Sequence, residues 1–453
     1  MTFDHESLAL LEEALRRLEE GYRGLPEPSS RADVRALREV LLSAAERLRD
    51  NYPYHHPLYV GQMLKPPHPI ARLAYTLALF LNPNNHALDG GRATSQMEKE
   101  AVAGIARMLG WGAHLGHLCG GGTMANFEAL WVGRELRPGK AVAASAQAHY
   151  THARLSSVLG VPFHPIAIDA RGRMDVRSLE GALATHAIGT VVVTLGTTAA
   201  GSVDPLAEIL ALRGRHDFRV HVDAAYGGYF TLAGNLGAEA RRAFERIAEA
   251  DSVVIDPHKH GLQPYGCGCV LFRDPGVGRF YKHDSPYTYF SSADLHLGEI
   301  SLECSRPGAA AAALWTTMRL LPLRPGGDFA RGLEAGREAA LTLHQALSKD
   351  DRFAPLMPPE LDIVTWAVRA ASSTESSAMA RRIFDAAAHR DLHLALATFP
   401  RTMLEPAAPV TRWDADEIVC LRACVMKPEH RDWMAEILSR LQAAAGDACN
   451  AGG

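Results

Sequence analysis

A lysine flanked by two histidines is the first feature of this sequence that points to covalent chemistry. Lys259 follows the β-branched run Ser252–Ile255, within the segment DPHKHG. Desolvation and neighbouring positive charge destabilise an ammonium in such a place. They favour the neutral amine that forms a Schiff base with a carbonyl group. Most lysines are simply exposed on the surface, so this interpretation depends on the residues gathered around Lys259.

An aspartate at the end of a second hydrophobic run could serve a ring-shaped ligand. Asp223 lies in the segment HVDAAYGG, which runs from His221 to Gly228. In open α/β sheets, ligands bind at the carboxyl ends of the strands. A carboxylate there can pair with a protonated pyridine nitrogen, and the small residues after it leave room for a flat ring. The alternative role for this aspartate is a helix N-cap.

A glycine run before a helical pattern supplies a possible anion site. Gly120–Gly122 are followed by Thr123 and then by apolar residues at helical spacing. Free backbone N–H groups at a helix N-terminus bind anions such as phosphate. No Lys-Ser/Thr pair follows at the spacing of a nucleotide-binding P-loop, and glycine runs are often only turns.

One histidine among 21 lies near a predicted helix start and adds to this set. His149 lies in the segment AHYTHA. An imidazole is flat enough to stack on a conjugated ring, and it can also move protons. Most histidines are structural, so His149 gains meaning only in combination with the other motifs.

In their chain order, these motifs resemble the group II pyridoxal-phosphate-dependent amino-acid decarboxylases, which have the aspartate-aminotransferase fold (fold type I). The loop CGGGTMAN is similar to the family's TSGGTEAN-like loop, and the segments AHYTHA, LGTT, HVDAAY and PHK match further family motifs. The likeness runs from about Asn82 to Trp315, and less securely to Arg422. It is nearest to bacterial tyrosine decarboxylase relatives. It implies an enzyme that uses pyridoxal 5'-phosphate.

The resemblance also implies a role for each motif residue. Lys259 would hold the cofactor as an internal aldimine, Asp223 would pair with the pyridine nitrogen, and His149 would stack on the ring, opposite Ala225. The residues implied to hold the cofactor are Gly121, Gly122, Thr123, His149, Thr198, Asp223, Ala225, His258 and Lys259. Of these, the phosphate would fall to Gly121, Gly122, Thr123 and His258.

The implied reaction is α-decarboxylation of an L-amino acid to its amine and CO₂ through a quinonoid, with an aromatic substrate such as tyrosine favoured. Arg422 and Arg306 are candidates for binding the α-carboxylate, although either could be structural or, for Arg306, serve a subunit interface. Tyr287 or Tyr289 is the candidate proton donor, with packing of the loop as the alternative.

Other reactions of the same cofactor stay open. A carbon–carbon lyase, an oxidative aldehyde-forming enzyme and an aminotransferase would use the same lysine, aspartate and histidine, and an inactive cofactor-binding homologue is the non-enzymatic alternative. The sequence departs from the family at His260, where an aromatic residue is common, and at Met124, where the loop usually has Glu. We expect these two positions to affect substrate choice rather than cofactor chemistry.

The composition excludes several other classes of protein. The 453 residues carry 47 Lys+Arg and 51 Asp+Glu, a net charge of −4 that argues against nucleic acid or an anionic membrane as partner. No stretch has the length and apolarity of a transmembrane helix or of a signal peptide. The seven cysteines are scattered without a CxxC pair, and no zinc ligand set is evident. We therefore expect free thiols, no metal and a cytoplasmic location.

The elements that must position these residues form three predicted domains. Residues 1–70 contain two amphipathic helices with leucine-rich stripes, such as Leu8, Leu11, Leu15 and Leu18. Residues 71–324 alternate short apolar strands with helices, which predicts an α/β domain with a mostly parallel, seven-stranded type of sheet between helices. Residues 325–453 predict a small α+β domain. Since the N-terminal stripes need a covering surface, and since the family builds its site at a dimer interface, we expect a homodimer with a shared active site.

Overall fold

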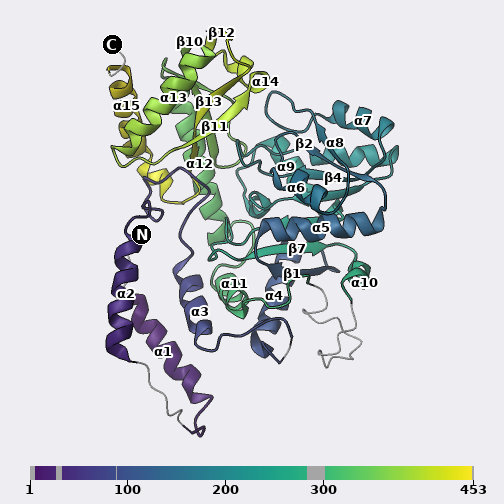
Figure 1. Ribbon diagram of the computed structural model, residues 1–453, viewed down its shortest axis with the longest axis vertical. Helices are drawn as coiled ribbons and strands as arrows, with labels where there is room; N and C mark the ends of the chain where they lie inside the picture. Colours follow the sequence, from purple (N-terminus) through teal and green to yellow (C-terminus); the bar gives the residue numbers. More distant parts are fainter. Residues whose placement is uncertain (1–5, 27–32, 88, 283–300, 451–453) are drawn as a thin grey trace.

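The computed structural model of the chain describes residues 6–26, 33–87, 89–282 and 301–450. A seven-stranded sheet, a four-stranded sheet, a two-stranded sheet and the helices packed on them make up its body (Figure 1). The α-helices in chain order are α1 (Glu6–Glu20), α2 (Val34–Leu48), α3 (Pro69–Leu79), α4 (Arg92–Met108), α5 (Gly122–Leu136), α6 (Thr151–Val158), α7 (Val176–Thr185), α8 (Leu206–Ala211), α9 (Ala238–Glu245), α10 (Gly278–Tyr281), α11 (Gly308–Leu320), α12 (Asp328–Ser348), α13 (Ser373–Ala388), α14 (Arg401–Leu404) and α15 (His430–Asn450).

The larger sheet has seven strands in the order β1-β7-β6-β5-β4-β2-β3. The strands are β1 (Leu115–Cys119), β2 (Ala141–Ser145), β3 (Phe163–Ile166), β4 (Ile188–Thr194), β5 (Arg219–Asp223), β6 (Ser252–Ile255) and β7 (Gly268–Phe272). β7 pairs antiparallel with β1 and β6, and the other pairs are parallel. The predicted mostly parallel sheet is therefore confirmed.

Helices cover both faces of this sheet, because its strands are apolar on both sides. Val192 of β4 packs with residues of α5 and α6, whereas Val191 and Val193 face the cluster that contains α4, α8 and α9. Figure 1 shows α5 lying across the sheet near β7. Strands that are buried on both faces read as continuous hydrophobic runs, which is why the sequence predicted β4, β5 and β6.

The smaller sheet is formed by the C-terminal part of the chain. Its four strands follow the order β11-β13-β9-β8. The strands of this part are β8 (Phe353–Pro355), β9 (Ile363–Val368), β10 (Ala370–Ser372), β11 (Ala395–Pro400), β12 (Val410–Arg412) and β13 (Glu417–Cys424), with β10 and β12 paired separately. One face packs against α12, α13 and α15 through Trp366, Leu421 and their neighbours.

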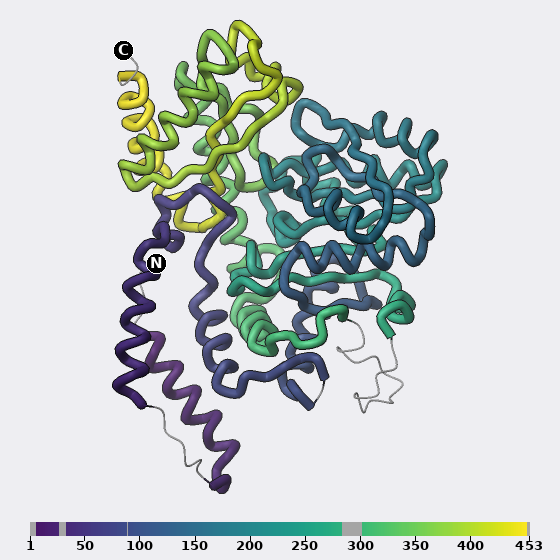
Figure 2. The backbone as a smooth tube through the Cα atoms, viewed as in Figure 1, coloured from purple at the N-terminus to yellow at the C-terminus, as the bar shows by residue number. Residues whose placement is uncertain are grey.

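The N-terminal segment connects one end of the molecule with the near edge of the smaller sheet. α1 and α2 project beyond the body, and the chain then returns along the smaller sheet, where Val60 bonds to His393 and Cys424 through the backbone (Figure 2). Leu8, Leu37 and Leu41 on the two helices are more than half exposed. Among the described residues, no helix is long and apolar enough to cross a membrane.

Candidate active site

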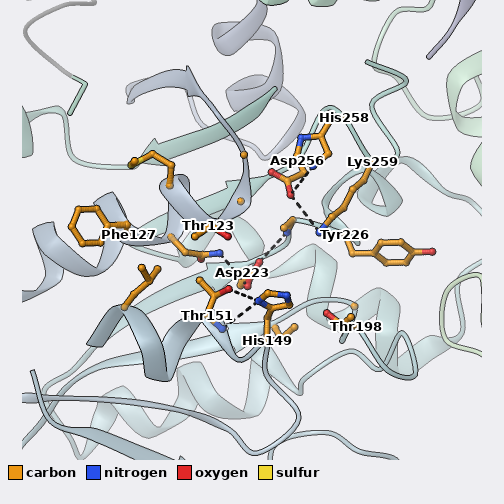
Figure 3. A pocket seen from close by; sticks show the side chains of 18 of the residues that line it. Thr123, Phe127, His149, Thr151, Thr198, Asp223, Tyr226, Asp256, His258 and Lys259 are labelled. Carbon is orange, nitrogen blue, oxygen red and sulfur yellow. Dashed lines mark hydrogen bonds and ion pairs between the residues drawn. The ribbon is translucent and has the colours of Figure 1, made fainter. Parts of the chain in front are cut away.

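A cavity of about 670 Å³ opens at the carboxyl ends of β1, β4, β5 and β6. This is the sheet edge at which α/β folds bind ligands. Figure 3 shows the side chains of its lining converging from several turns. The lining residues are Gly120, Gly121, Gly122, Thr123, Met124, Asn126, Phe127, His149, Thr151, Leu155, Thr194, Gly196, Thr198, Asp223, Ala225, Tyr226, Asp256, His258 and Lys259. All nine predicted cofactor-binding residues lie in this set.

Lys259 enters the cavity from the turn after β6. Its Nζ lies 3.3 Å from Asp256 Oδ2, and His258 Nε2 lies 3.5 Å from the same oxygen (Figure 3). Burial raises the pKa of Asp256, although the charges of Lys259 and His258 oppose the shift. The sequence predicted only positive neighbours for the lysine. That prediction was incomplete, because the nearest charged group is a carboxylate that stabilises the ammonium.

The second histidine of the lysine segment turns away from the cavity. His260 is buried, its Nδ1 lies 2.9 Å from Tyr226 O, and its Nε2 lies 2.8 Å from Asp362 Oδ2. The Tyr226 hydroxyl donates to the other oxygen of Asp362 at 2.6 Å. Since neither acceptor carries a proton to donate, both ring nitrogens of His260 must donate, and the ring is a buried imidazolium paired with Asp362. The opposite charge of His260 lowers the pKa of Asp362 against the effect of burial.

Asp223 ends β5 at the floor of the cavity and is buried. Its Oδ2 accepts hydrogen bonds from His152 Nε2 at 2.8 Å and from Asn126 Nδ2 at 3.3 Å, and its Oδ1 accepts one from the backbone N–H of Ala225 at 3.1 Å. Burial acts to raise the pKa of Asp223, but the bond from His152 and the charge of Lys259 outweigh it and hold the pKa below its usual range. The carboxylate is thus ionised and can accept a hydrogen bond from a further donor.

The glycine-rich loop forms the N-terminus of α5. Gly121 is the N-cap, with a φ of 151° that favours glycine, and the N–H groups of the first turn have no acceptor within the helix. A Cβ on Gly122 would come within 2.7 Å of Asp256 Oδ2. A side chain at Gly122 would therefore collide with Asp256, so the loop can pass this close to the lysine turn only with glycine at that position.

His149 lines the cavity opposite the lysine turn. Its Nδ1 lies 2.5 Å from Thr151 Oγ1, and its ring is tilted against Tyr150 with a centroid distance of 4.4 Å. Burial lowers the pKa of His149, and Lys259 adds to this effect. The stacking role that the sequence predicts for His149 stays a prediction.

The structure separates the two candidate arginines. Arg422 on β13 is buried beside the cavity, and it donates to the backbone oxygens of Thr198 at 2.8 Å and Ala199 at 3.1 Å. Neither arginine is among the lining residues, but Arg422 is bonded to the backbone of Thr198, which is one of them, whereas Arg306 is bonded to none of them. Its Nη1 lies 2.5 Å from Glu98 Oε1, in an ion pair that is almost fully buried. The candidate proton donors Tyr287 and Tyr289 lie outside the described residues.

Sequence reasoning did not single out three of the residues that meet here. Asn126 lies four residues after Gly122, one turn into α5, and His152 lies three residues after His149 in the same motif. Asp256 stands three residues before Lys259. Helical spacing was the available signal for the first two, but the contacts with Asp223 depend on how α5 and α6 pack on the sheet.

The donor set of the cavity fits pyridoxal phosphate. The N-terminus of α5 suits a phosphate, the ionised Asp223 suits a protonated pyridine nitrogen, and the Lys259 amine suits an aldehyde. Thr194 Oγ1 and Asp256 Oδ1, both in the lining, are buried polar atoms without a partner among the described residues. Such atoms indicate a site built for a polar ligand.

Known proteins share both this sequence pattern and this fold. The family described as "Pyridoxal-dependent decarboxylase conserved domain" matches residues 134–369, just over half of the chain. The L-tyrosine decarboxylase of Enterococcus faecium is 29% identical over 465 residues, which cover 78% of this chain and 76% of that protein. The L-aspartate decarboxylase of Thermococcus kodakarensis is 28% identical, with 78% of this chain and 90% of that protein covered.

Solved structures extend the likeness of fold to almost the whole chain. Mouse CSAD in its apo form superposes with a TM-score of 0.78 at 22% identity, over 92% of this chain and 90% of that chain. Oryza sativa TDC with PLP and tryptamine gives a TM-score of 0.79 at 18% identity, over 98% and 96%. Together with the family match and the cavity, these findings identify the chain as a member of the pyridoxal-phosphate-dependent amino-acid decarboxylase family.

Proposed function

We propose that this decarboxylase removes the α-carboxyl group of an aromatic L-amino acid such as tyrosine and releases the amine and CO₂. The observation that supports an aromatic substrate is the chemistry of the cavity wall. Phe127 and Leu155 contribute apolar surface, and the described part of the lining has no lysine or arginine besides Lys259. An acidic side chain such as that of aspartate would have no second cation to pair with there.

Different residues of the cavity hold different parts of the cofactor. The N–H groups at the start of α5 bind the phosphate, and Lys259 supplies the amine that binds the cofactor. Asp223, ionised in its hydrogen-bond network, holds a proton at the pyridine nitrogen. Held by these residues, pyridoxal phosphate would supply an electron sink for the bond to the carboxyl carbon that breaks at Cα.

Two further residues orient the reacting groups. His149 presents the flat face of a neutral imidazole, because burial lowers its pKa. Arg422 donates one N–H to Thr198 O and another to Ala199 O. It also makes two longer contacts of 3.4 Å, to Gly61 O and to Gln62 Oε1. Four contacts leave one of its five donors for the α-carboxylate, so Arg422 is our candidate for orienting the bond that breaks.

Product analysis on a panel of amino acids tests this proposal. L-tyrosine, L-phenylalanine, L-tryptophan, L-aspartate and L-glutamate are each offered to the protein with pyridoxal phosphate, and amine and CO₂ are measured. A higher kcat/KM for tyrosine than for aspartate is expected. Preference for aspartate would overturn the substrate assignment, whereas an aldehyde with ammonia and peroxide, or dependence on a keto acid, would overturn the reaction type.

We also propose a homodimer that shares its active site. The exposed leucines of α1 and α2 support it, since a pair of amphipathic helices needs a covering surface. Light scattering during size exclusion tests this: a mass of two chains is expected, and a variant without residues 1–48 is expected to shift toward one chain. A single-chain mass for the full protein would contradict the proposal.

The organisation into three domains, 1–70, 71–324 and 325–453, is likewise proposed, with the two separate sheets as its support. Limited proteolysis with cleavage near residues 70 and 325 would bear it out. A cytoplasmic location is supported by seven cysteines that are all unpaired. Cell fractionation tests that location.

A further inference from the structure

Besides His149, the AHYTHA motif supplies another histidine, His152, which is hydrogen-bonded to Asp223 at the floor of the cavity. His152 lies in the first turn of α6, its side chain is fully buried, and its Nε2 is 2.8 Å from Asp223 Oδ2. This bond ties α6 to the end of β5. His152 does not line the cavity, so any effect it has on a ligand there must pass through Asp223.

The direction of this hydrogen bond follows from the chemistry of its two partners. The ionised carboxylate of Asp223 can only accept, so the Nε2 of His152 carries an N–H and donates it to Oδ2. The other ring nitrogen, Nδ1, is buried without a partner among the described residues.

A second chain of hydrogen bonds reaches the same oxygen. His221 Nε2 lies 2.8 Å from Asn126 Oδ1, and Asn126 Nδ2 lies 3.3 Å from Asp223 Oδ2. Burial lowers the pKa of His221 to about 3, so its ring is neutral. Since an amide oxygen can only accept, His221 donates to Asn126, and the Asn126 amide donates to Asp223.

The two oxygens of Asp223 therefore differ. Oδ2 accepts from both His152 and Asn126, whereas Oδ1 accepts only the N–H of Ala225 among the described residues. A carboxylate oxygen has two lone pairs, so Oδ1 retains acceptor capacity. We propose that His152 is a positioning residue that occupies Oδ2 and thereby fixes Asp223 with Oδ1 free for the pyridine nitrogen of the cofactor. This inference rests on the cofactor-binding role proposed for Asp223.

A matched pair of variants tests the donor separately from the packing. His152→Leu removes the N–H but keeps a buried side chain, and His152→Gln keeps an amide N–H at a similar reach. We expect His152→Leu to raise the Kd of the apoprotein for pyridoxal phosphate about 10- to 100-fold, since the free energy of one hydrogen bond to a charged group corresponds to a factor of this size in Kd. His152→Gln is expected to stay within about threefold of the wild type. Equal affinity of His152→Leu and the wild type overturns the inference.

Proton NMR of the apoprotein gives a readout that does not depend on activity. The Nε2–H of His152 is expected as a slowly exchanging downfield resonance in the wild type, and to be missing in His152→Leu and displaced in Asp223→Asn. The same resonance unchanged in Asp223→Asn would overturn the bond on which the inference rests. An equal loss of affinity in the Leu and Gln variants, with equally lowered Tm, would show a structural role and also overturn it.

Failure of the inference about His152 can be distinguished from failure of the proposed function. A wild-type protein whose visible absorbance with pyridoxal phosphate is not lost in Lys259→Ala would defeat the cofactor assignment itself. A wild type that binds the cofactor through Lys259, together with a His152→Leu variant that binds it equally well, would defeat only the role of His152.

Discussion

Asp256 lies between the lysine turn and the glycine-rich loop: its Oδ2 is 3.3 Å from Lys259 Nζ and is also the atom that a Cβ on Gly122 would approach most closely. One carboxylate thus contacts both the amine and the loop of the proposed cofactor site. Changes on either side of it should affect cofactor binding, for different reasons.

Lys259→Ala is expected to abolish the visible absorbance band that the wild type shows with pyridoxal phosphate, and to lower kcat at least about 10³-fold, because the amine that binds the cofactor is gone. Absorption spectra before and after borohydride check this. Lys349→Ala, at an exposed lysine after α12, is the control and should behave as wild type. A borohydride-sensitive band that persists in Lys259→Ala would show that another lysine binds the cofactor.

Gly122→Ala should weaken phosphate binding, since the new methyl group would come within 2.7 Å of a buried carboxylate oxygen. We expect the Kd for pyridoxal phosphate to rise at least about tenfold, which corresponds to about 1.4 kcal/mol. Titration of the apoprotein followed by absorbance measures it. Gly112→Ala, where a Cβ would meet nothing within 4 Å, should leave the Kd unchanged. Equal affinities of the two variants would remove the loop from the site.

Arg306→Gln is expected to destabilise the protein rather than to raise KM selectively. The substitution leaves Glu98 buried without its cation, a change that costs about 3 to 5 kcal/mol in free energy of unfolding. Urea unfolding measures the loss, with Arg16→Gln in the exposed pair with Glu12 as control, expected to cost less than about 1 kcal/mol. Wild-type stability combined with a raised KM would instead assign Arg306 to the substrate.

The stability of the protein should rise from pH 7 to pH 10 because of two lysines, of which Lys427 is buried and Lys65 is half-buried. Lys65 and Lys427 line a second cavity, of about 250 Å³. Burial lowers the pKa of Lys65 to about 8 and that of Lys427 to about 7, from a model-compound value of 10.5. Between the folded and unfolded pKa values the unfolded chain binds more protons, so the free energy of unfolding increases with pH there and falls as the pH drops toward 7.

Lys427→Met isolates this effect. The variant should gain about 4 kcal/mol relative to wild type at pH 6 compared with pH 10, since each unit of pKa lowering corresponds to about 1.4 kcal/mol. Urea unfolding at both pH values measures the difference, with Lys349→Met as the exposed control. A difference between variant and wild type that does not change with pH would contradict it.

The sequence predicted those parts of the fold and site that depend on local patterns. The run Val191–Val193 is apolar at every position because both faces of β4 are covered, and this is visible without a structure. Gly122, Asp223 and Lys259 each stand at the end of a strand or in the turn after one, so their meeting follows from the parallel sheet.

Contacts made by helix packing were beyond prediction. β1 was missed because its sequence, LGHLC, contains a glycine and a histidine; His117 is buried there only because Glu128 of α5 lies 2.8 Å from its Nε2. Likewise, nothing local links Arg306 to Glu98, which is 208 residues away. The hydrogen bond from His152 to Asp223 also depends on helix packing and could not be predicted from the sequence.

The paired groups His260 and Asp362 have a mechanical consequence. Asp362 immediately precedes β9 of the smaller sheet, while His260 and Tyr226 belong to turns of the larger one. Separating the two sheets would break this pair and leave a buried imidazolium and a buried carboxylate each without its partner, at a cost of several kcal/mol. The lysine turn is therefore anchored from the C-terminal third of the chain. Truncation before residue 362 should therefore leave the larger sheet folded around a lysine turn that has lost this contact, so the C-terminal domain contributes to the site of the larger one.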